Sequence, residues 1–415
     1  MDFKFTAEEE SFRREVKGWL KEAIPPRWRE LPTGFWQETE ESWKISRQFQ
    51  KNLGLKGWLA PAYPVELGGA GLSHIKRLIL AEELTYHDAP VSIETEITVN
   101  WVGMALQHFG SEQQKQDFIP RIAKGDIIFC LGYSEPNAGS DLASLQTRAV
   151  EQGDNYVING QKIWCSYAHY ADYCWLGAVT DPDAGKHRNM SMFVVDMKNP
   201  GITIRPLINV IGCHSFNEVF FDDVRTPKDS LVGVKNNGWF QLAMALDFER
   251  SGVQTAAANK LLLDHMVNYA KANKRGGKLL SKDPILRNMI AEMAIEIEVA
   301  RMLCYRIAWI YSKGGHSNYE SSQAMIFGSE LLRRISDAGM RVLGQYGQLA
   351  YGSQRAVERA AMCRSYLASL SIGVGGGTNE IQRNIIAMRG LGLPRKEQVR
   401  VIFLIPGGYY HGFSF

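Results

Sequence analysis

The spacing of apolar residues along the chain changes twice, and these changes divide it into three regions. Over residues 1–126 apolar residues recur every three or four positions, which predicts amphipathic helices. Thr6 and Glu9 have the capping-box spacing that begins the first of these helices. A Gly- and Pro-rich segment, 61–71, interrupts the series. We therefore expect an N-terminal α-helical domain over residues 1–126.

Residues 127–237 show a different pattern, in which short β-branched and aromatic runs alternate with Gly, Asn and Asp. The runs are Tyr156–Ile158, Tyr173–Val179, Met192–Val195, Ile202–Ile204 and Glu218–Phe221. Such runs predict the short strands of an antiparallel sheet. Because the strands do not alternate with helices and no Gly-x-Gly-x-x-Gly is present, a doubly wound dinucleotide fold is disfavoured. We expect a middle antiparallel β domain over residues 127–237.

Helical periodicity returns after residue 238 in segments long enough to form a bundle. These segments are Trp239–Ala272, Pro284–Tyr311 and Ser321–Leu343. The expected fold class is therefore α+β, in which a C-terminal four-helix bundle over residues 238–396 follows the β domain. The last residues, 397–415, form an aromatic, Gly-rich and nearly uncharged tail. We expect this tail to pack on a neighbouring subunit rather than on a membrane.

Composition narrows the class of protein. The 415 residues are 45% hydrophobic and 22% charged with a net charge of +3, which is typical of a globular protein and does not indicate a nucleic-acid partner. No apolar run spans a bilayer, the N-terminus does not have the pattern of a secretory leader, and six scattered cysteines lack metal-ligand spacing. We therefore expect a cytoplasmic protein with no metal, nucleic-acid or membrane partner. The basic stretch 271–278 can meet a phosphorylated ligand, although a solvated helix end is the commoner role.

Four motifs in the β region and beyond it identify a family. Leu131–Asp141 reads Leu-Gly-Tyr-Ser-Glu-Pro-Asn-Ala-Gly-Ser-Asp, and Gly160–Ser166 reads Gly-Gln-Lys-Ile-Trp-Cys-Ser. Glu218–Val224 and Gly377–Arg383 follow in that order. Together these motifs resemble those of the acyl-CoA dehydrogenase family, and the resemblance covers nearly the whole chain up to Arg395.

The resemblance implies the reaction, its cofactor and its partners. The expected activity is FAD-dependent α,β-dehydrogenation of an acyl-CoA thioester to the trans-2-enoyl-CoA, with electrons passing to an electron-transferring flavoprotein. In this reaction a carboxylate removes a proton from the α-carbon, and the β-carbon gives a hydride to flavin N5. The residues that the resemblance assigns to the flavin are Tyr133, Ser134, Gly139, Ser140, Trp164, Ser166, Thr378, Glu380 and Gln382.

The side chains themselves support several of these assignments. An isoalloxazine ring needs a flat apolar wall and a few polar contacts at its edge. Trp164 supplies the wall, and the hydroxyls of Ser134 and Ser166 are candidate partners for the edge. Gly139 lets the backbone approach a phosphate, and Ser140 adds a hydroxyl donor. A single tryptophan is more often a core residue, and only the surrounding motifs reverse that interpretation for Trp164.

The usual catalytic base of the family is absent. In most relatives it is the glutamate of a Tyr-Glu-Gly-Thr run, whereas Gly375–Thr378 here reads Gly-Gly-Gly-Thr. Gly376 therefore has no side chain that accepts a proton. Its backbone N–H can still polarise the thioester carbonyl, so that it keeps a catalytic role. The lost side chain also opens space near the reacting carbons, and we expect a branched, cyclic or otherwise bulky acyl group.

Glu249 is the candidate replacement for this base. A minority of the family, resembling the isovaleryl and long-chain enzymes, carries the base on a helix of the C-terminal domain, and Leu246–Arg250 is the matching segment. At helical spacing the neighbours of Glu249 are apolar or small, namely Ala245, Leu246, Gly252 and Val253. Burial among such residues should raise the pKa of its carboxyl group. The alternative is that Glu249 only pairs with a basic side chain such as Arg250.

The same segment supplies candidate substrate contacts. Asp247 faces another side of the predicted helix and is spaced to pair with Arg250. The resemblance implies that Arg250 reaches the phosphopantetheine or pyrophosphate of CoA. Ser140 is also a candidate for substrate binding.

Half of the shared flavin site of homotetrameric relatives is missing. There, a second subunit contributes Arg-x-x-Phe-Gly and Gln-x-x-Gly-Gly segments. Here Asn273–Gly277 has Asn and Gly in place of Arg and Phe, and Arg341–Gln345 has Arg and Gln in place of Gln and the last Gly. We expect an α2β2 heterotetramer in which a sister chain supplies the rest. The alternative is a homotetramer in which Lys274 or Arg275 binds the phosphate.

Two other functions fit the same motifs. An acyl-CoA oxidase or a flavin monooxygenase would share the fold but expose the flavin to oxygen. A non-catalytic partner subunit would account for the missing glutamate. The intact segments around Ser134 and Trp164 argue against the second of these alternatives.

Overall fold

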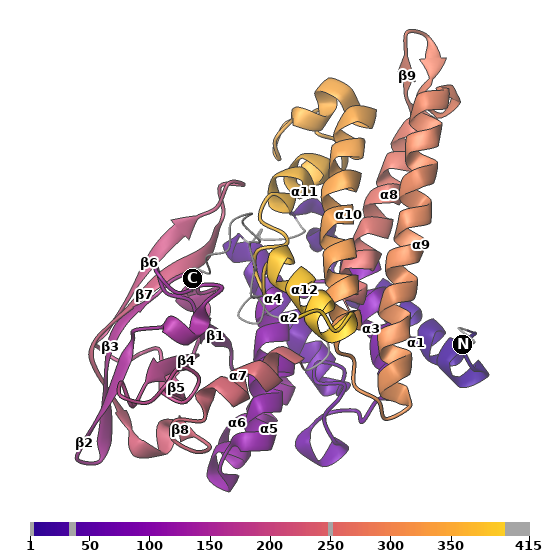
Figure 1. Cartoon of the computed structure of the whole chain (residues 1–415). Helices are drawn as coiled ribbons and strands as arrows, with labels where there is room; N and C mark the ends of the chain where they lie inside the picture. Colours follow the sequence, from indigo (N-terminus) through magenta and orange to yellow (C-terminus); the bar gives the residue numbers. More distant parts are fainter. Residues whose placement is uncertain (1–3, 33–38, 248–251, 395–415) are drawn as a thin grey trace, which may run out of the picture.

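The computed structural model describes residues 4–32, 39–247 and 252–394, and side chains are described outside 243–251. Figure 1 shows the strands gathered on one side of the molecule and the long helices α8, α9 and α10 side by side on the other. The order of helices, sheet and helices is the α+β arrangement that the apolar pattern predicts.

The N-terminal region is helical, as predicted. Its helices are α1 (Ala7–Ala23), α2 (Glu40–Leu55), α3 (His74–Tyr86), α4 (Ile93–Glu96), α5 (Met104–Phe109) and α6 (Glu112–Lys124). The predicted capping box is confirmed, since the Thr6 hydroxyl accepts the Glu9 N–H and the Glu9 carboxylate accepts the Thr6 N–H. Phe12, Val16 and Leu20 form the buried face of α1.

A π-helix, Ile97–Gly103, joins α4 to α5. Its wide turns follow from one buried side chain, because the Tyr63 hydroxyl donates a hydrogen bond of 2.6 Å to the Val99 carbonyl. A β-carbon at Gly103 would lie 1.7 Å from that hydroxyl oxygen, so only glycine leaves room for it. Such π-turns are frequent at functional sites.

The middle region is a twisted sheet whose path runs β6-β7-β3-β2-β4-β5-β8, with β1 paired to β4. The strands are β1 (Phe129–Gly132), β2 (Arg148–Gln152), β3 (Asn155–Lys162), β4 (Tyr173–Val179), β5 (Met190–Asp196), β6 (Ile202–Ile208), β7 (His214–Pro227) and β8 (Leu231–Val232). The prediction of a wholly antiparallel sheet was wrong for two pairs, since β4 pairs in parallel with both β1 and β2. The segment from β1 to β4 is long enough to bring the chain back to the same end of the sheet, as a parallel pair requires.

The C-terminal region is a bundle in which α8, α9 and α10 pack on one another, with α11 and α12 against α10. Its helices are α7 (Gly238–Asp247), α8 (Val253–Ala272), α9 (Pro284–Ser312), α10 (Tyr319–Leu343), α11 (Ala361–Ser369) and α12 (Asn379–Ile385). A short hairpin of β9 (Lys274–Arg275) and β10 (Lys278–Leu279) lies between α8 and α9.

The predicted single helix Trp239–Ala272 was wrong. The structure has α7, which ends at Asp247, and α8, which begins at Val253. Gly252 precedes α8 with φ +66°, a left-handed conformation that cannot continue a right-handed helix. The prediction of apolar neighbours around Glu249 concerns a segment, 248–251, that lies outside the described residues.

A buried charge network joins the N-terminal helices to the bundle. Arg13 of α1 donates to Glu82 of α3 at 2.7 Å, and Arg301 of α9 donates to the other oxygen of the same carboxylate at 2.6 Å. The Tyr305 hydroxyl donates to Glu82 at 2.8 Å. This network fixes α3 between α1 and α9, and α3 forms one wall of the cavity that is described below.

Among the described residues, no helix is long and apolar enough to cross a membrane. The described His, Cys, Asp and Glu residues form no group of three or more that is placed to hold a metal ion.

Candidate active site

The loop after β1 is fixed by a buried ion pair. Lys162 of β3, which is fully buried, donates to the Glu135 carboxylate at 2.7 Å and to the Tyr133 carbonyl at 3.1 Å. The same carboxylate accepts the backbone N–H groups of Gln146 and Thr147 at 2.6 and 2.9 Å. Burial raises the pKa of Glu135, but Lys162 and these hydrogen bonds outweigh it, so the pKa lies below its usual value. Complete burial lowers the pKa of Lys162 despite the neighbouring carboxylate.

This ion pair places two predicted segments side by side. The Ile163 N–H donates to the Ser134 carbonyl at 2.9 Å, which joins the first motif to the segment that follows β3 and carries Trp164. Ser134 and Ser166 are half-buried, so that both hydroxyls lie near the surface of this joint. The structure thus brings together the two segments that carry Tyr133, Ser134, Trp164 and Ser166.

Trp164 is held in an unusual position for a tryptophan. Its backbone is left-handed, with φ +61°, and its indole is 59% exposed and meets Phe216 edge to face. The residue after Trp164 is Cys165, and the fully buried Asn217 holds it through two hydrogen bonds. The side-chain amide of Asn217 donates to the Cys165 carbonyl at 3.0 Å, and the Cys165 N–H donates to the backbone carbonyl of Asn217 at 3.0 Å. A left-handed non-glycine residue costs free energy, and exposing an indole forgoes burial. Both features fit a residue that is placed for a planar ligand rather than for the core.

Gly139 and Ser140 are exposed at the end of the same loop. A β-carbon at Gly139 would meet no atom of the chain within 4 Å, and its φ is not left-handed. The chain itself therefore does not require glycine here. The open space agrees with the prediction that a phosphate approaches the backbone at this position.

The glycine loop before α12 carries the second group of predicted residues. Gly376 and Gly377 have φ of +71° and +98°. The Thr378 hydroxyl caps α12 by accepting the Ile381 N–H at 3.2 Å. Gln382 is buried, and its amide nitrogen donates to the carbonyls of Gly376 and Gly377 at 3.4 and 3.3 Å.

Gln382 is therefore directed into the protein. Its carbonyl oxygen also accepts the Ser322 hydroxyl at 2.7 Å, so that the whole amide supports the glycine loop. Glu380 is exposed on the first turn of α12. A β-carbon at Gly376 would lie 3.5 Å from Met325 Cε, so the space admits a side chain but the backbone conformation disfavours one.

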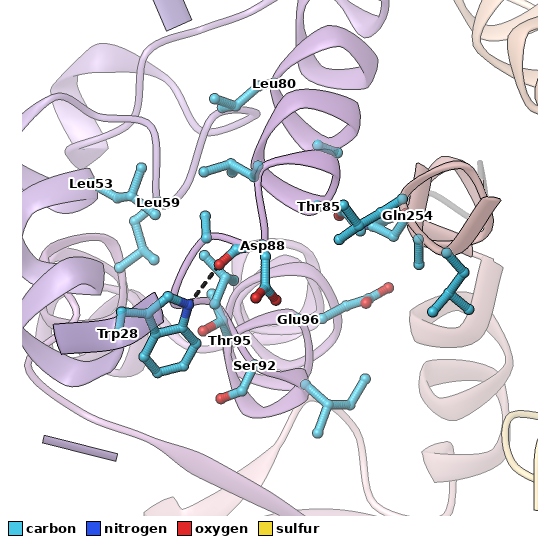
Figure 2. Close-up of a pocket in the computed structure, with 18 of the residues that line it drawn as sticks. Trp28, Leu53, Leu59, Leu80, Thr85, Asp88, Ser92, Thr95, Glu96 and Gln254 are labelled. Carbon is cyan, nitrogen blue, oxygen red and sulfur yellow. Dashed lines mark hydrogen bonds between the residues drawn. The ribbon is translucent and has the colours of Figure 1, made fainter. Parts of the chain in front are cut away.

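A cavity of about 350 Å³ lies between the N-terminal helices and the bundle. One face of α8 lines it through Gln254, Ala258, Leu261, Leu262 and His265. In Figure 2 Gln254 and Trp28 lie on opposite sides of the cavity with Asp88 between them. Tyr167, three residues after Trp164, also lines it. The turn that follows Trp164 and Ser166 therefore reaches the cavity.

The walls are mostly apolar with a few polar side chains, as is usual for small-molecule sites. Thr85, Ser92, Thr95, Glu96 and Asp88 come from α3 and the segment after it (Figure 2). Glu358, Arg359 and Arg364 come from the other end of the chain. The sequence predicted none of these lining residues, because they come from segments far apart along the chain.

The predicted base and two predicted substrate contacts cannot be placed. Glu249 and Arg250 lie outside the described residues, and of Asp247 only the backbone is described, as the last residue of α7. The helix that follows, α8, begins at Val253 and lines the cavity from Gln254 onward. Glu249 thus precedes the first cavity-lining residue of α8 by five positions in the sequence.

Comparison with known proteins decides the family. Models of the acyl-CoA dehydrogenase N-terminal, middle and C-terminal domains match residues 6–126, 130–224 and 236–391. The chain belongs to the acyl-CoA dehydrogenase family. It is therefore a flavin-dependent oxidoreductase that dehydrogenates acyl-CoA thioesters and uses FAD as its cofactor.

Similar proteins cover almost the whole acyl-CoA dehydrogenase chain. Acyl-CoA dehydrogenase FadE26 of Mycobacterium tuberculosis is 35% identical over 403 residues, which are 95% of this chain and 99% of the relative. A chain of the ChsE4-ChsE5 complex from Mycobacterium tuberculosis is 36% identical, with a TM-score of 0.86 and coverage of 95% and 100%. A chain of the Tcur3481-Tcur3483 steroid ACAD is 31% identical, with a TM-score of 0.85 and the same coverage.

The residues present in this acyl-CoA dehydrogenase fit FAD. The exposed indole of Trp164 offers a flat wall, and the hydroxyls of Ser134 and Ser166 lie at the adjoining joint. The open backbone at Gly139 leaves room for a phosphate. These features would serve no purpose in a sheet that only packs on its neighbours.

The two altered segments of this acyl-CoA dehydrogenase lie next to each other and make contacts within their own chain. Arg275 Nη2 donates to the Val342 carbonyl at 2.9 Å and thereby caps α10. The Asn273 amide donates to the Tyr269 carbonyl at 2.9 Å at the end of α8, and Arg341 pairs with Asp337 at 2.8 Å. Three side chains of these segments are thus committed to helix ends and to a surface ion pair.

Proposed function

We propose that the protein dehydrogenates a bulky, cyclic or branched acyl-CoA at the α,β bond, with Glu249 as the base. The observation that carries this proposal is the 350 Å³ cavity along α8, a helix that begins just after the Glu249 segment; Tyr167, three residues after Trp164, also lines this cavity. The sequence positions of Glu249 and Gln254 favour a carboxylate at one end of this cavity. A proton acceptor there would meet the α-carbon of an acyl group that occupies the cavity.

The conformation at Gly376 supports a base located elsewhere. A glutamate at this position would have to adopt φ of +71°, which non-glycine residues rarely do. The backbone N–H of Gly376 remains available to hydrogen-bond the thioester oxygen, where negative charge grows as the α-proton leaves. In this proposal Gly376 polarises the carbonyl and Glu249 accepts the proton.

The remaining predicted residues bind and orient. FAD, when bound, supplies the acceptor for the hydride that leaves the β-carbon. Trp164 forms the wall of its site, while Tyr133, Ser134, Ser166 and Thr378 contribute polar groups. Ser140 and Gly139 approach a phosphate, and Glu380 and Gln382 support the site from α12. Asp247 and Arg250 are proposed to hold the CoA portion of the substrate.

A panel of thioesters tests the substrate proposal. The mainly apolar lining of the cavity, the absent side chain at Gly376 and the similarity to a protein described as a steroid ACAD all favour a ring-bearing acyl group. We expect turnover of polycyclic or branched thioesters to exceed that of straight-chain thioesters of equal carbon number. Much faster turnover of the straight chains would contradict the proposal.

The second subunit is proposed to be a sister chain in an α2β2 heterotetramer. Support comes from the altered segments, whose Arg275 and Asn273 are used within their own chain, and from two similar structures named for pairs of proteins, ChsE4-ChsE5 and Tcur3481-Tcur3483. Lys274 is the remaining basic side chain for the homotetramer alternative. The FAD content of this chain, produced with and without the sister chain, separates the two. One tightly bound FAD per chain without a partner would refute the heterotetramer.

The electron acceptor is proposed to be an electron-transferring flavoprotein. Anaerobic mixing with the substrate should bleach the flavin, and admission of air should restore its colour slowly. Rapid reoxidation with stoichiometric hydrogen peroxide would instead indicate an oxidase, and hydroxylated product a monooxygenase. We also propose a cytoplasmic location, for which the free state of all six cysteines is support. The domain boundaries proposed are 1–126, 127–237 and 238–396, with the tail 397–415 outside the described residues.

A further inference from the structure

Arg364 of α11 is a buried cation that lines the cavity and has little to bind. Its residue is 6% exposed. Nη1 donates weakly to the Arg359 carbonyl at 3.5 Å, and within the described residues Nε and Nη2 have no hydrogen-bond partner. Burial, together with the charge of Arg359, lowers the pKa of Arg364 to about 10, so it stays protonated at neutral pH. A buried charged donor without an acceptor is costly and uncommon.

The charge of Asp88 relieves this cost only in part. Asp88 is paired with Arg359, whose Nη2 lies 3.2 Å from its carboxylate. Arg359 also donates through Nη1 to the carbonyls of Trp28 and Leu31 at 3.3 and 2.8 Å. The three side chains Arg359, Arg364 and Asp88 together carry one excess positive charge. The pairing of Arg359 with Asp88 therefore leaves the guanidinium donors of Arg364 available.

Arg364 enters the cavity from α11, whereas Gln254 enters it from the first turn of α8. Figure 2 shows Trp28 and Gln254 on opposite sides, and Arg359 binds the Trp28 carbonyl while Arg364 binds that of Arg359. Gln254 is the cavity residue nearest in sequence to Glu249. An acyl group whose thioester lies beside Gln254 would therefore direct its far end toward Arg364.

The backbone before α11 is strained in a way that maintains this placement. Glu358, Arg359 and Ala360 have φ of 45°, 55° and 60°, a left-handed turn without a glycine. Such a turn persists only where its surroundings enforce it. Here the four hydrogen bonds and ion contacts of the Arg359 side chain and carbonyl enforce it. The turn sets the direction in which α11 begins and hence where Arg364 enters the cavity.

A second group on the cavity wall has the same character. The Nδ1 atom of His265 is buried and has no hydrogen-bond partner among the described residues. His265 is eleven positions after Gln254, which places it about 16 Å further along α8. Ala258, Leu261 and Leu262 line the wall between them and are apolar. The α8 wall is thus apolar along its length and polar again at the end remote from Glu249.

We propose that the acyl group carries an oxygen acceptor, a ring ketone or a carboxylate, on the part furthest from the thioester, and that Arg364 binds it. This inference rests on the proposed function, because it takes the cavity as the acyl site. A wholly hydrocarbon acyl group would leave two guanidinium donors desolvated and unpaired in the complex. A site with such donors discriminates strongly against a ligand that lacks the matching acceptor.

Three thioesters with one ring skeleton test the proposal. They carry a ketone, a carboxylate or only hydrogen on the ring furthest from the thioester. The holoenzyme, produced with its sister chain, should have a kcat/KM for one oxygenated thioester about 10- to 100-fold above that for the hydrocarbon. The preferred oxygenated thioester identifies the group. Arg364→Met should lose most of this preference. Arg364→Lys should retain part of it, because lysine keeps the positive charge but cannot donate the paired hydrogen bonds of a planar guanidinium.

The controls separate failure of this inference from failure of the proposed function. Arg364→Met should contain as much FAD as the wild type, so that a lost preference reports on Arg364 rather than on a lost fold. Equal kcat/KM for the three ring thioesters in the wild type would overturn the role of Arg364, even if Arg364→Met failed to fold. An unchanged preference in Arg364→Met would do the same. If no ring thioester bleached the flavin, the proposed function itself would fail.

Discussion

Replacing Lys162 by methionine would remove the cation that fixes the flavin loop while keeping most of the side-chain volume. Lys162 is fully buried and Glu135 is 8% exposed, so the carboxylate would remain in place with only the two N–H groups of Gln146 and Thr147. Breaking a buried ion pair by removing one partner costs about 3–5 kcal/mol. For a chain of this size we expect the thermal midpoint to fall by roughly 3–6 °C.

The loss should reach the cofactor as well as the fold. Lys162 also donates to the Tyr133 carbonyl, next to Ser134, so the variant should release FAD more readily. Thermal unfolding and the FAD-to-protein ratio after gel filtration measure both effects. Lys162→Met combined with Glu135→Gln removes both charges, and it should recover a large part of the lost stability. A single variant with an unchanged midpoint and full FAD would refute the reasoning.

The pH dependence of this variant has a defined sign. In the wild type the pKa of Glu135 lies below its usual value, so the pair stabilises the protein above that value and its contribution is lost as the pH falls. In the Lys162→Met variant we expect burial to raise the pKa of Glu135. The ionised carboxylate then destabilises the folded protein, and protonation at lower pH removes this cost. The stability deficit of Lys162→Met relative to the wild type should therefore shrink as the pH is lowered from 8 toward 5. A deficit that grows over this range would contradict the assignment.

Three further substitutions test other parts of the structure. Gly103→Ala would place a β-carbon 1.7 Å from the Tyr63 hydroxyl and should lower the free energy of unfolding in urea by about 1–3 kcal/mol or more. The control Gly18→Ala in α1, where a β-carbon would meet no atom within 4 Å, should leave the stability unchanged or raise it. Tyr305→Phe removes the donor to Glu82 and should lower the free energy of unfolding by about 1–3 kcal/mol, with unchanged turnover at 25 °C. Gly376→Glu should lower the thermal midpoint, because the backbone φ of +71° at this position disfavours a side chain. Added to Glu249→Gln, the same substitution should not restore activity. Restored turnover would show that a base in the glycine loop can take the proton.

The sequence pattern predicted the positions of most helices and strands, but not the helix break at Gly252 or the way in which the strands pair. The run Tyr173–Val179 matches β4 residue for residue, because a buried strand flanked by turns has a clear local signature. The break at Gly252 was missed, since one glycine in an apolar helical run is tolerated in many helices. The parallel pairing of β1 with β4 depends on how the chain returns to the sheet, which no local pattern records.

The candidate site was predictable where one segment carries the chemistry. The motifs around Ser134 and Trp164 come together as predicted, through Lys162 and Glu135, although the sequence did not reveal that ion pair. The cavity could not be predicted, because its walls come from α3, α8 and α11. The unpaired donors of Arg364 depend on which tertiary neighbours Asp88 binds, a question that spacing along the chain does not address.

The rate at which the substrate bleaches the flavin tests the central claim most directly. Wild type, Glu249→Gln and the control Glu292→Gln, which alters an exposed side chain of α9, are each prepared as FAD-loaded holoenzyme and mixed anaerobically with the preferred ring thioester. Removal of the general base should slow bleaching by on the order of 10²–10⁴-fold in Glu249→Gln, with FAD content and thioester binding retained and the control unchanged. Bleaching of Glu249→Gln at the wild-type rate would show that another group takes the α-proton and would contradict the account.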